Sequence, residues 1–205
     1  MIRREKGQMI RLEKIINEET EHELDRLLSG KAELLKEAKA GEVCYQDSQD
    51  WLDTSLCAGP AQVERILRKA EEIRKKADAF VLIGVGGSNN AARSVIEALA
   101  ENLEGPAVRK NRVEIIYAGN TLSPHEVRKL IRKLDGREFY IDCIAKNFET
   151  LEPGSAFRIL REYMYRRFGK EKAAERIMAT GTAGSSLYRI CVEQGYDFFE
   201  FPLNV

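Results

Sequence analysis

The stretch Phe80-Val-Leu-Ile-Gly-Val-Gly-Gly-Ser88 decides the fold of this chain. An apolar run that ends in glycines and a serine predicts a buried strand, and a helical pattern begins directly after it at Asn89. A helix entered through such a turn points unpaired amide groups and the positive end of its dipole above the strand. The stretch therefore predicts a binding site for a phosphate or carboxylate group.

Strand-like segments alternate with helical segments from residue 79 to the C-terminus. The strand-like segments are rich in Val, Ile, Phe and Tyr, and they cover residues 79–85, 113–118, 139–145, 177–180 and 198–201. This alternation predicts an α/β fold, a three-layer αβα sandwich around a five-stranded parallel sheet. In the flavodoxin-like strand order 2-1-3-4-5 the first and third strands are neighbours, so the loops that follow them open at the same edge.

The N-terminal region has a different pattern. Residues 10–40 are charged and helix-favouring, which predicts one or two outer helices, and residues 41–60 lose this periodicity before it resumes over 61–77. We expect residues 1–60 to form a helical and irregular extension packed on the core, and residues 61–205 to form the main domain. Trp51 is expected to fill a gap in the core.

Composition excludes several classes of function. Among 205 residues, 33 are Lys or Arg and 33 are Asp or Glu, so no net charge attracts nucleic acid or an anionic membrane. The start of the chain lacks the apolar segment of a signal peptide, and no apolar run approaches about 18 residues. Four scattered cysteines and two histidines predict no metal site. We therefore expect a cytoplasmic protein without metal or cofactor.

Two groups with chemical potential have simpler interpretations. Cys143 lies in an apolar strand pattern and Cys191 in a helical one, so both are expected to be buried and unreactive. The sequence Ser123-Pro-His-Glu126 predicts the start of a helix with a capping box. This leaves His125 as an exposed residue of the first turn.

The glycine-rich turn does not fit the common nucleotide-binding motifs. Gly84-x-Gly86 is followed by Asn89 where a dinucleotide fingerprint has its third glycine. The second strand ends in Tyr117-Ala-Gly-Asn120, without the acidic residue that binds a ribose, and the Walker motif is absent. NAD and ATP are therefore disfavoured.

The same turn resembles that of the glucose-6-phosphate isomerase family, whose sugar-isomerase (SIS) domain carries the motif G-[IV]-G-G-S-x-x-G-A-R. The matching residues are Gly84-Val-Gly-Gly-Ser-Asn-Asn-Ala-Ala-Arg93, and the similarity runs from about residue 40 to the C-terminus. Further matches are Trp51-Leu-Asp53, Tyr117-Ala-Gly-Asn120, Thr150-Leu-Glu-Pro153, Ala156-Phe-Arg158, Phe168-Gly-Lys170, Arg176-Ile-Met-Ala-Thr180 and Phe201-Pro202. The resemblance implies a phosphosugar-binding domain of a cytoplasmic enzyme of glycolysis and gluconeogenesis.

The resemblance also implies a set of phosphate-binding residues. In the family, the serine of the turn and a loop written S-K-[ST]-x-T-T hold the phosphate of the sugar. Carried over by position, the binding residues are Gly86, Gly87, Ser88, Lys146, Asn147 and Thr150. Ala145, Asn147 and Glu149 replace hydroxyl residues of the loop, and the Glu149 carboxylate would repel a phosphate.

The family's catalytic base, ring-opening histidine and enediolate-stabilising arginine belong to a second domain, which would follow Val205. No catalytic residue is therefore assigned here, and we expect a truncated or divergent isomerase. It would bind glucose 6-phosphate or fructose 6-phosphate, and it would be inactive unless a C-terminal chain complements it. A homodimer is a further possible assembly. The alternatives are a regulatory sensor for a neutral or amino sugar and a protein-association scaffold. Without any ligand, Ser88 and Thr150 would simply cap helices.

Overall fold

The computed structural model describes residues 17–40, 48–53, 55–100 and 113–204. The chain divides into two compact units, Met1–Gln49 and Asp50–Val205. In the first unit, helix α1 (Glu18–Ala40) has three glutamates in its first turn, where they complement the positive end of the helix dipole. The predicted outer helix is therefore present, and its packing on the core stays a prediction.

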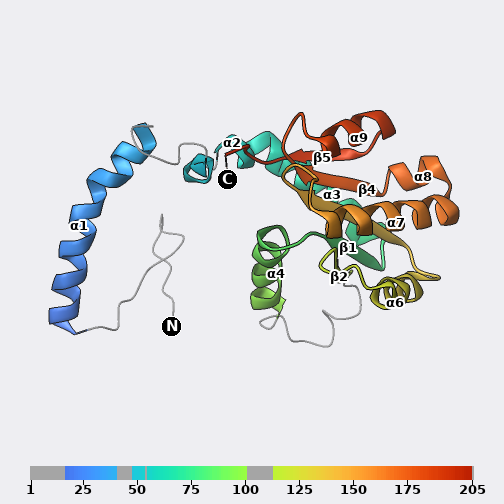
Figure 1. Ribbon diagram of the computed structural model, residues 1–205, viewed down its shortest axis with the longest axis horizontal. Helices are drawn as coiled ribbons and strands as arrows, with labels where there is room; N and C mark the ends of the chain where they lie inside the picture. Colours follow the sequence, from blue (N-terminus) through green and yellow to red (C-terminus); the bar gives the residue numbers. More distant parts are fainter. Residues whose placement is uncertain (1–16, 41–47, 54, 101–112, 205) are drawn as a thin grey trace. The chain divides into compact units, whose positions relative to one another are not determined.

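The second unit contains a five-stranded sheet (Figure 1). Its strands are β1 (Ala79–Ile83), β2 (Glu114–Ala118), β3 (Phe139–Ala145), β4 (Ile177–Gly181) and β5 (Asp197–Glu200). Every neighbouring pair is parallel, and the strand order is β2-β1-β3-β4-β5. The predicted fold class and strand order are confirmed.

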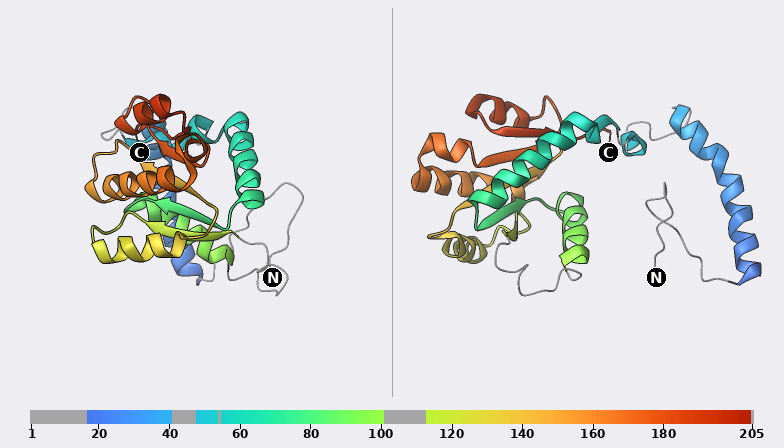
Figure 2. Two further views of the ribbon diagram at one scale, coloured as in Figure 1. Left: turned by 90° about the vertical axis from the view of Figure 1, so that its right-hand side faces the viewer. Right: turned by 180° about the vertical axis from the view of Figure 1, so that it is seen from behind.

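Helices cover both faces of this sheet. The helices described in this unit are α2 (Ser55–Ala58), α3 (Pro60–Lys76), α4 (Gly87–Ala100), α6 (Pro124–Leu134), α7 (Leu151–Phe168), α8 (Lys170–Ala174) and α9 (Ser186–Gln194), with a 3-10 turn η2 (Asp50–Leu52) before α2; of these, α4 projects beyond the carboxyl edge of the sheet (Figure 1). Figure 2 shows α3 on one side of the sheet and α6, α7 and α9 on the other, which gives three layers. No helix among the described residues is both long and apolar enough to span a membrane.

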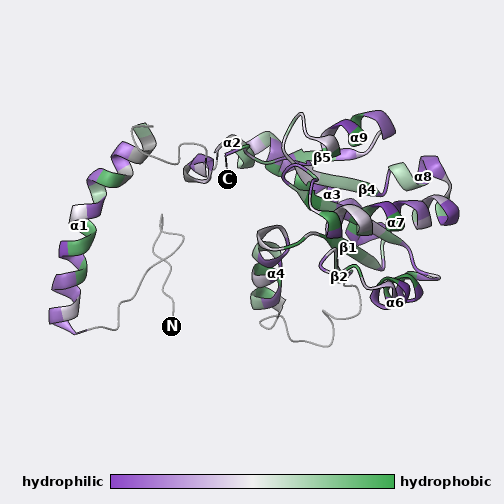
Figure 3. Cartoon of the chain, in the orientation of Figure 1, coloured by the Kyte–Doolittle hydropathy of each residue, from purple (hydrophilic) through white to green (hydrophobic). Residues whose placement is uncertain are grey.

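The larger core lies between the sheet and helices α6 to α9. Alternate residues of the strands, such as Val81 and Ile141, pack there against Phe157 and Leu160 of α7. The strands are mostly apolar in Figure 3, whereas the helices show polar outer faces. Burial of this kind contributes about 25 cal/mol per Å² of apolar surface removed from water, so this layer dominates the stability of the unit.

Both cysteines expected in the core are there. Cys143 is 0% exposed and Cys191 is 1% exposed. Burial raises the pKa of the Cys143 thiol well above its usual range and the pKa of Cys191 to about 12. Neither thiol is ionised near neutral pH, so both act as apolar packing groups.

The second face of the sheet is covered by α3. Ile73 of this helix packs against Tyr140, Met178 and Phe199. Glu72 also joins helix to sheet: burial disfavours its charge, but hydrogen bonds from Lys69, Lys76 and Tyr140 lower its pKa to about 2.

One core prediction is wrong. Trp51 is 64% exposed and does not fill a gap in the core. It lies in the short turn η2, and this turn is held by a reciprocal pair of hydrogen bonds: the Asp50 amide donates to the Asn204 carbonyl (2.9 Å), and the Asn204 amide donates to the Asp50 carboxylate (3.0 Å). These two hydrogen bonds, one between backbone groups and one to the Asp50 side chain, therefore fix this segment without burying the indole.

The start of α6 was predicted only in part. Ser123 occupies the N-cap position and Pro124 begins the helix, but the Ser123 hydroxyl makes no capping hydrogen bond. Instead the Ser123 amide donates to the hydroxyl of Thr121 (3.1 Å). The capping box is therefore wrong, whereas the exposed position of His125 is confirmed.

Candidate functional site

The loop after β1 delivers backbone amides to the carboxyl edge of the sheet. Gly86 has φ = +58°, a left-handed conformation that glycine adopts without strain, and α4 begins immediately afterwards at Gly87. The amides of Gly87 and Ser88 lie in the first turn, where no preceding helical carbonyl is available to them. Asn89, only 5% exposed, donates to the Gly84 carbonyl (3.3 Å) and holds the turn.

Ser88 lies at the start of α4. It lies inside the first turn of α4 rather than before it, so it is not the N-cap residue. Its side chain is partly exposed, and its hydroxyl makes no hydrogen bond with any described residue. The simple capping interpretation therefore does not fit Ser88.

The loop after β3 has a more rigid geometry. Phe148 has φ = +64°, which is unusual for a residue with a side chain, and its ring packs edge-on against Phe157 at 5.7 Å. Lys146, Asn147 and Thr150 are all exposed. Thr150 is the N-cap residue of α7, but its hydroxyl makes no capping hydrogen bond. The simple capping interpretation therefore does not fit Thr150 either, and its role as a binding residue stays a prediction.

The two loops meet at Gly119. They leave the adjacent strands β1 and β3, which pair in parallel up to Ile83 and Cys143. A Cβ placed on Gly119, at φ = +86°, would lie 3.0 Å from the amide nitrogen of Gly84 and 3.2 Å from Cα of Pro153. The turn that precedes α4 and the first turn of α7 therefore converge at one point, with the end of β2 packed between them.

One further side chain at this edge was missed in the sequence. Thr182 follows β4, and its amide donates to the Lys146 carbonyl (3.3 Å). The residue is 7% exposed, and its buried hydroxyl has no hydrogen-bond partner within the described part of the chain. Because an unpaired buried hydroxyl costs about 1–3 kcal/mol, it is a candidate for contact with a ligand. Its position directly after a predicted strand could have identified it.

The electrostatics of the loop after β3 are mixed. The Asn147 side-chain amide donates to the Glu149 carboxylate (2.7 Å), and the Glu149 amide lies 3.4 Å from the Asn147 side-chain oxygen. The loop therefore presents a negative charge beside the positive N-terminus of α7. Among the described residues, no three His, Cys, Asp or Glu side chains gather as a metal site.

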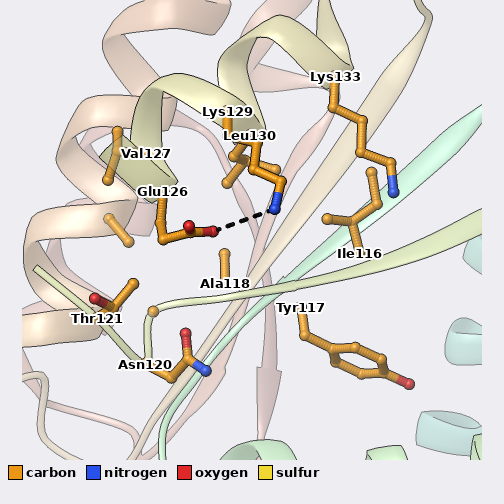
Figure 4. Close-up of a pocket in the computed structure, with 12 residues that line it drawn as sticks. Ile116, Tyr117, Ala118, Asn120, Thr121, Glu126, Val127, Lys129, Leu130 and Lys133 are labelled. Carbon is orange, nitrogen blue, oxygen red and sulfur yellow. Dashed lines mark ion pairs between the residues drawn. The ribbon is translucent and has the colours of Figure 1, made fainter. Parts of the chain in front are cut away.

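A cavity of about 370 Å³ lies beside this edge, between β2 and α6 (Figure 4). Gly119 and Asn120 line one end, and Lys129 and Lys133 line the other. The lysines are paired, Lys129 with Glu126 (3.8 Å) and Lys133 with Glu114 (2.5 Å). The cavity therefore extends the concave surface next to the two loops without adding an unpaired cation.

Taken by itself, the fold defines a parallel α/β domain whose loops converge at the carboxyl edge of the sheet, where this class of protein binds ligands. Comparisons with known proteins give a narrower result. Glucose-6-phosphate isomerase of Acetivibrio thermocellus is 35% identical over 162 residues, covering 78% of this chain and 36% of the relative. The corresponding protein of Clostridium novyi is 33% identical over 193 residues, covering 93% of this chain and 42% of the relative.

Solved structures agree on the fold. A hypothetical protein of Thermus thermophilus superposes with a TM-score of 0.68 over 88% of this chain and 41% of that one, at 21% identity. A glucose-6-phosphate isomerase of Chlamydia trachomatis gives a TM-score of 0.57 over 69% of this chain and 25% of that one, at 19% identity. No family model matches the chain.

The chain is a partial glucose-6-phosphate isomerase-like domain, which confirms the resemblance seen in the sequence. It spans well under half the length of these curated relatives, 36% and 42% in the two cases above.

Proposed function

We propose that this chain is the phosphosugar-binding SIS domain of an aldose–ketose isomerase and takes glucose 6-phosphate or fructose 6-phosphate. The observation that supports this most strongly is the convergence of the two loops at Gly119, within contact distance of both Gly84 and Pro153. The relatives' name supplies the substrate class. On this proposal the protein works in the cytoplasm, in glycolysis and gluconeogenesis.

Binding would use the backbone amides and side chains of the two loops. The amides of Gly86, Gly87 and Ser88 would surround the phosphate at the positive end of α4, with the Ser88 and Thr150 hydroxyls donating hydrogen bonds. Lys146 would add positive charge to the rim, and Thr182 would complete the cradle from β4. Asn147 would hold the loop in place through Glu149 rather than contact the phosphate.

We further propose that this chain does not isomerise the sugar by itself. General acid–base catalysis contributes about 10²- to 10⁴-fold, and it needs a base within hydrogen-bond reach of the reacting carbon. The resemblance assigns that base, the ring-opening histidine and the arginine to a second domain. A complementing C-terminal chain or a homodimer partner would then supply the remaining wall of the site.

The Asn147–Glu149 pair favours one alternative. A carboxylate beside the N-terminus of α7 would lower affinity for a phosphate dianion and raise affinity for a protonated amino sugar, while a neutral sugar would escape the repulsion. In that case the domain would act as a regulatory sensor. Glucosamine and glucose therefore belong in the same binding experiment as their phosphorylated counterparts.

Calorimetric titration with glucose 6-phosphate, in buffer free of phosphate and sulfate, tests the proposal. Saturable binding is expected, with affinity reduced about tenfold or more in Ser88→Ala. Ser94→Ala is the matched control, because this serine lies on the same helix and its hydroxyl donates to the Ala91 carbonyl (2.9 Å). No binding of the phosphosugar would contradict the proposal, and saturable binding of glucosamine alone would establish the alternative.

A further inference from the structure

A second concave site lies on the other face of the sheet. A cavity of about 370 Å³ is lined by residues of α3 and of β1, β3, β4 and β5, and no residue of the two loops after β1 and β3 lines it. Its walls are mainly apolar, formed by side chains of α3 and the sheet: Ile66, Ile73, Phe80, Met178 and Phe199. Small-molecule sites in proteins have volumes of about 300–1,000 Å³ and similar apolar walls, so the cavity is large enough for a ligand.

One acidic group projects from β3 into this apolar surrounding. The hydroxyl of Thr180 lies 3.1 Å and 3.3 Å from the two carboxylate oxygens of Asp142, and no other described residue donates to them. A carboxylate has about four acceptor positions, so most of this capacity is unused.

The lysine that lines the cavity does not neutralise Asp142. Lys69 also lines the cavity, but its ammonium is bound to Asp197 (2.7 Å) and Glu72 (2.9 Å). An apolar cavity that holds an underused carboxyl on β3 and an occupied lysine on α3 is complementary to an apolar molecule with a positive end.

We propose that this cavity binds a small molecule with an apolar body and a protonated amine, whose ammonium donates to the Asp142 carboxylate. The apolar body would lie against Met178 and Phe199. The site is separate from the phosphate-binding loops, so its occupancy does not depend on the function proposed above.

The proposal predicts a pH dependence with a definite sign. Burial raises the pKa of Asp142 to about 7, while its hydrogen bond with Thr180 acts in the opposite direction. An ammonium prefers the ionised carboxyl, so affinity for an amine increases as pH rises through about 7. The other ionisable groups that line the cavity are Lys69 on α3, Cys57 on α2 and Glu200 on β5.

Three probes of one shape test the proposal by calorimetry or NMR titration: benzylamine, benzyl alcohol and benzoate. Benzylamine is expected to bind about tenfold or more tightly than benzyl alcohol, and about tenfold more tightly near pH 8 than near pH 5.5. Benzoate is expected not to bind. Equal binding of the amine and the alcohol, or no saturable binding of the amine, would overturn the proposal.

Two variants locate the binding. Asp142→Asn keeps the shape of the side chain and should remove the advantage of benzylamine over benzyl alcohol. The control Glu71→Gln changes an exposed acid of α3 and should leave that advantage unchanged. Ala70→Phe fills the cavity and should weaken both probes. Unaltered benzylamine affinity in either cavity variant, with a native circular dichroism spectrum, would place the binding elsewhere and refute the assignment.

Discussion

Replacing Gly119 by alanine should destabilise the second unit through two separable effects. At φ = +86°, a side chain costs about 1–2 kcal/mol. The new methyl group would also lie 2.9 Å from Cγ2 of Ile83, 3.0 Å from the Gly84 nitrogen and 3.2 Å from Cα of Pro153, and overpacking of this kind costs about 1–3 kcal/mol. The free energy of unfolding should therefore fall by about 2–5 kcal/mol in Gly119→Ala.

Equilibrium urea denaturation measures this loss, and a second glycine separates its two parts. Gly136 has φ = +76° and no heavy atom within 4 Å of an added Cβ, so Gly136→Ala should show only the backbone cost of about 1–2 kcal/mol. Gly119→Ala should also weaken glucose 6-phosphate binding, because the methyl group pushes the β1 loop away from α7. Equal destabilisation by the two substitutions would refute the convergence of the loops at Gly119.

Three further substitutions test individual groups. Glu149→Gln removes a negative charge from the loop after β3. In a calorimetric titration at low salt, this variant should bind glucose 6-phosphate about fivefold more tightly, or by about 1 kcal/mol. Unchanged affinity would show that the carboxylate does not face the ligand. Thr182→Val removes an unpaired buried hydroxyl and should maintain or raise the midpoint of thermal unfolding while lowering phosphosugar affinity, and unaltered affinity would remove Thr182 from the site. The folded-state pKa of Asp142 is raised from 3.8 to about 7, so its ionisation makes folding less favourable as pH rises from about 4 to about 7. Asp142→Asn should therefore gain up to about 4 kcal/mol of stability relative to the parent protein across that range. If urea denaturation gives parallel stability profiles for the two proteins, this reasoning is wrong.

The sheet was predictable because its strands are short apolar runs separated by helical patterns. The boundaries of β3 matched the expected range 139–145, and β5 began one residue before its expected range 198–201. Parallel strands buried on both faces read as continuous apolar sequence, and this signal is independent of distant contacts. Trp51 was different, because composition favours burial of an aromatic ring whereas two hydrogen bonds between the preceding Asp50 and the distant Asn204 fix its turn.

The position of the two loops at the carboxyl edge of the sheet was predictable from motif and topology, but their neighbours were not. Thr182 lies beside the loop after β3 because β3 pairs with β4, a contact between positions distant in sequence. Asp142 was overlooked as one polar residue in the strand Phe139–Ala145, although an acid in such a run must find a partner or change its protonation. The capping box at Ser123 failed because a competing acceptor, Thr121, lies two residues away.

The reciprocal hydrogen bonds between Asp50 and Asn204 bring the two ends of the second unit together. A linker of a few residues could therefore join position 204 to position 50 without distorting the fold, and new termini could be opened in an exposed turn such as that at Gly136. The unit is consequently suited to circular permutation. A reporter or partner domain attached at the new termini would lie at the amino ends of the strands, opposite the carboxyl edge where the two loops lie.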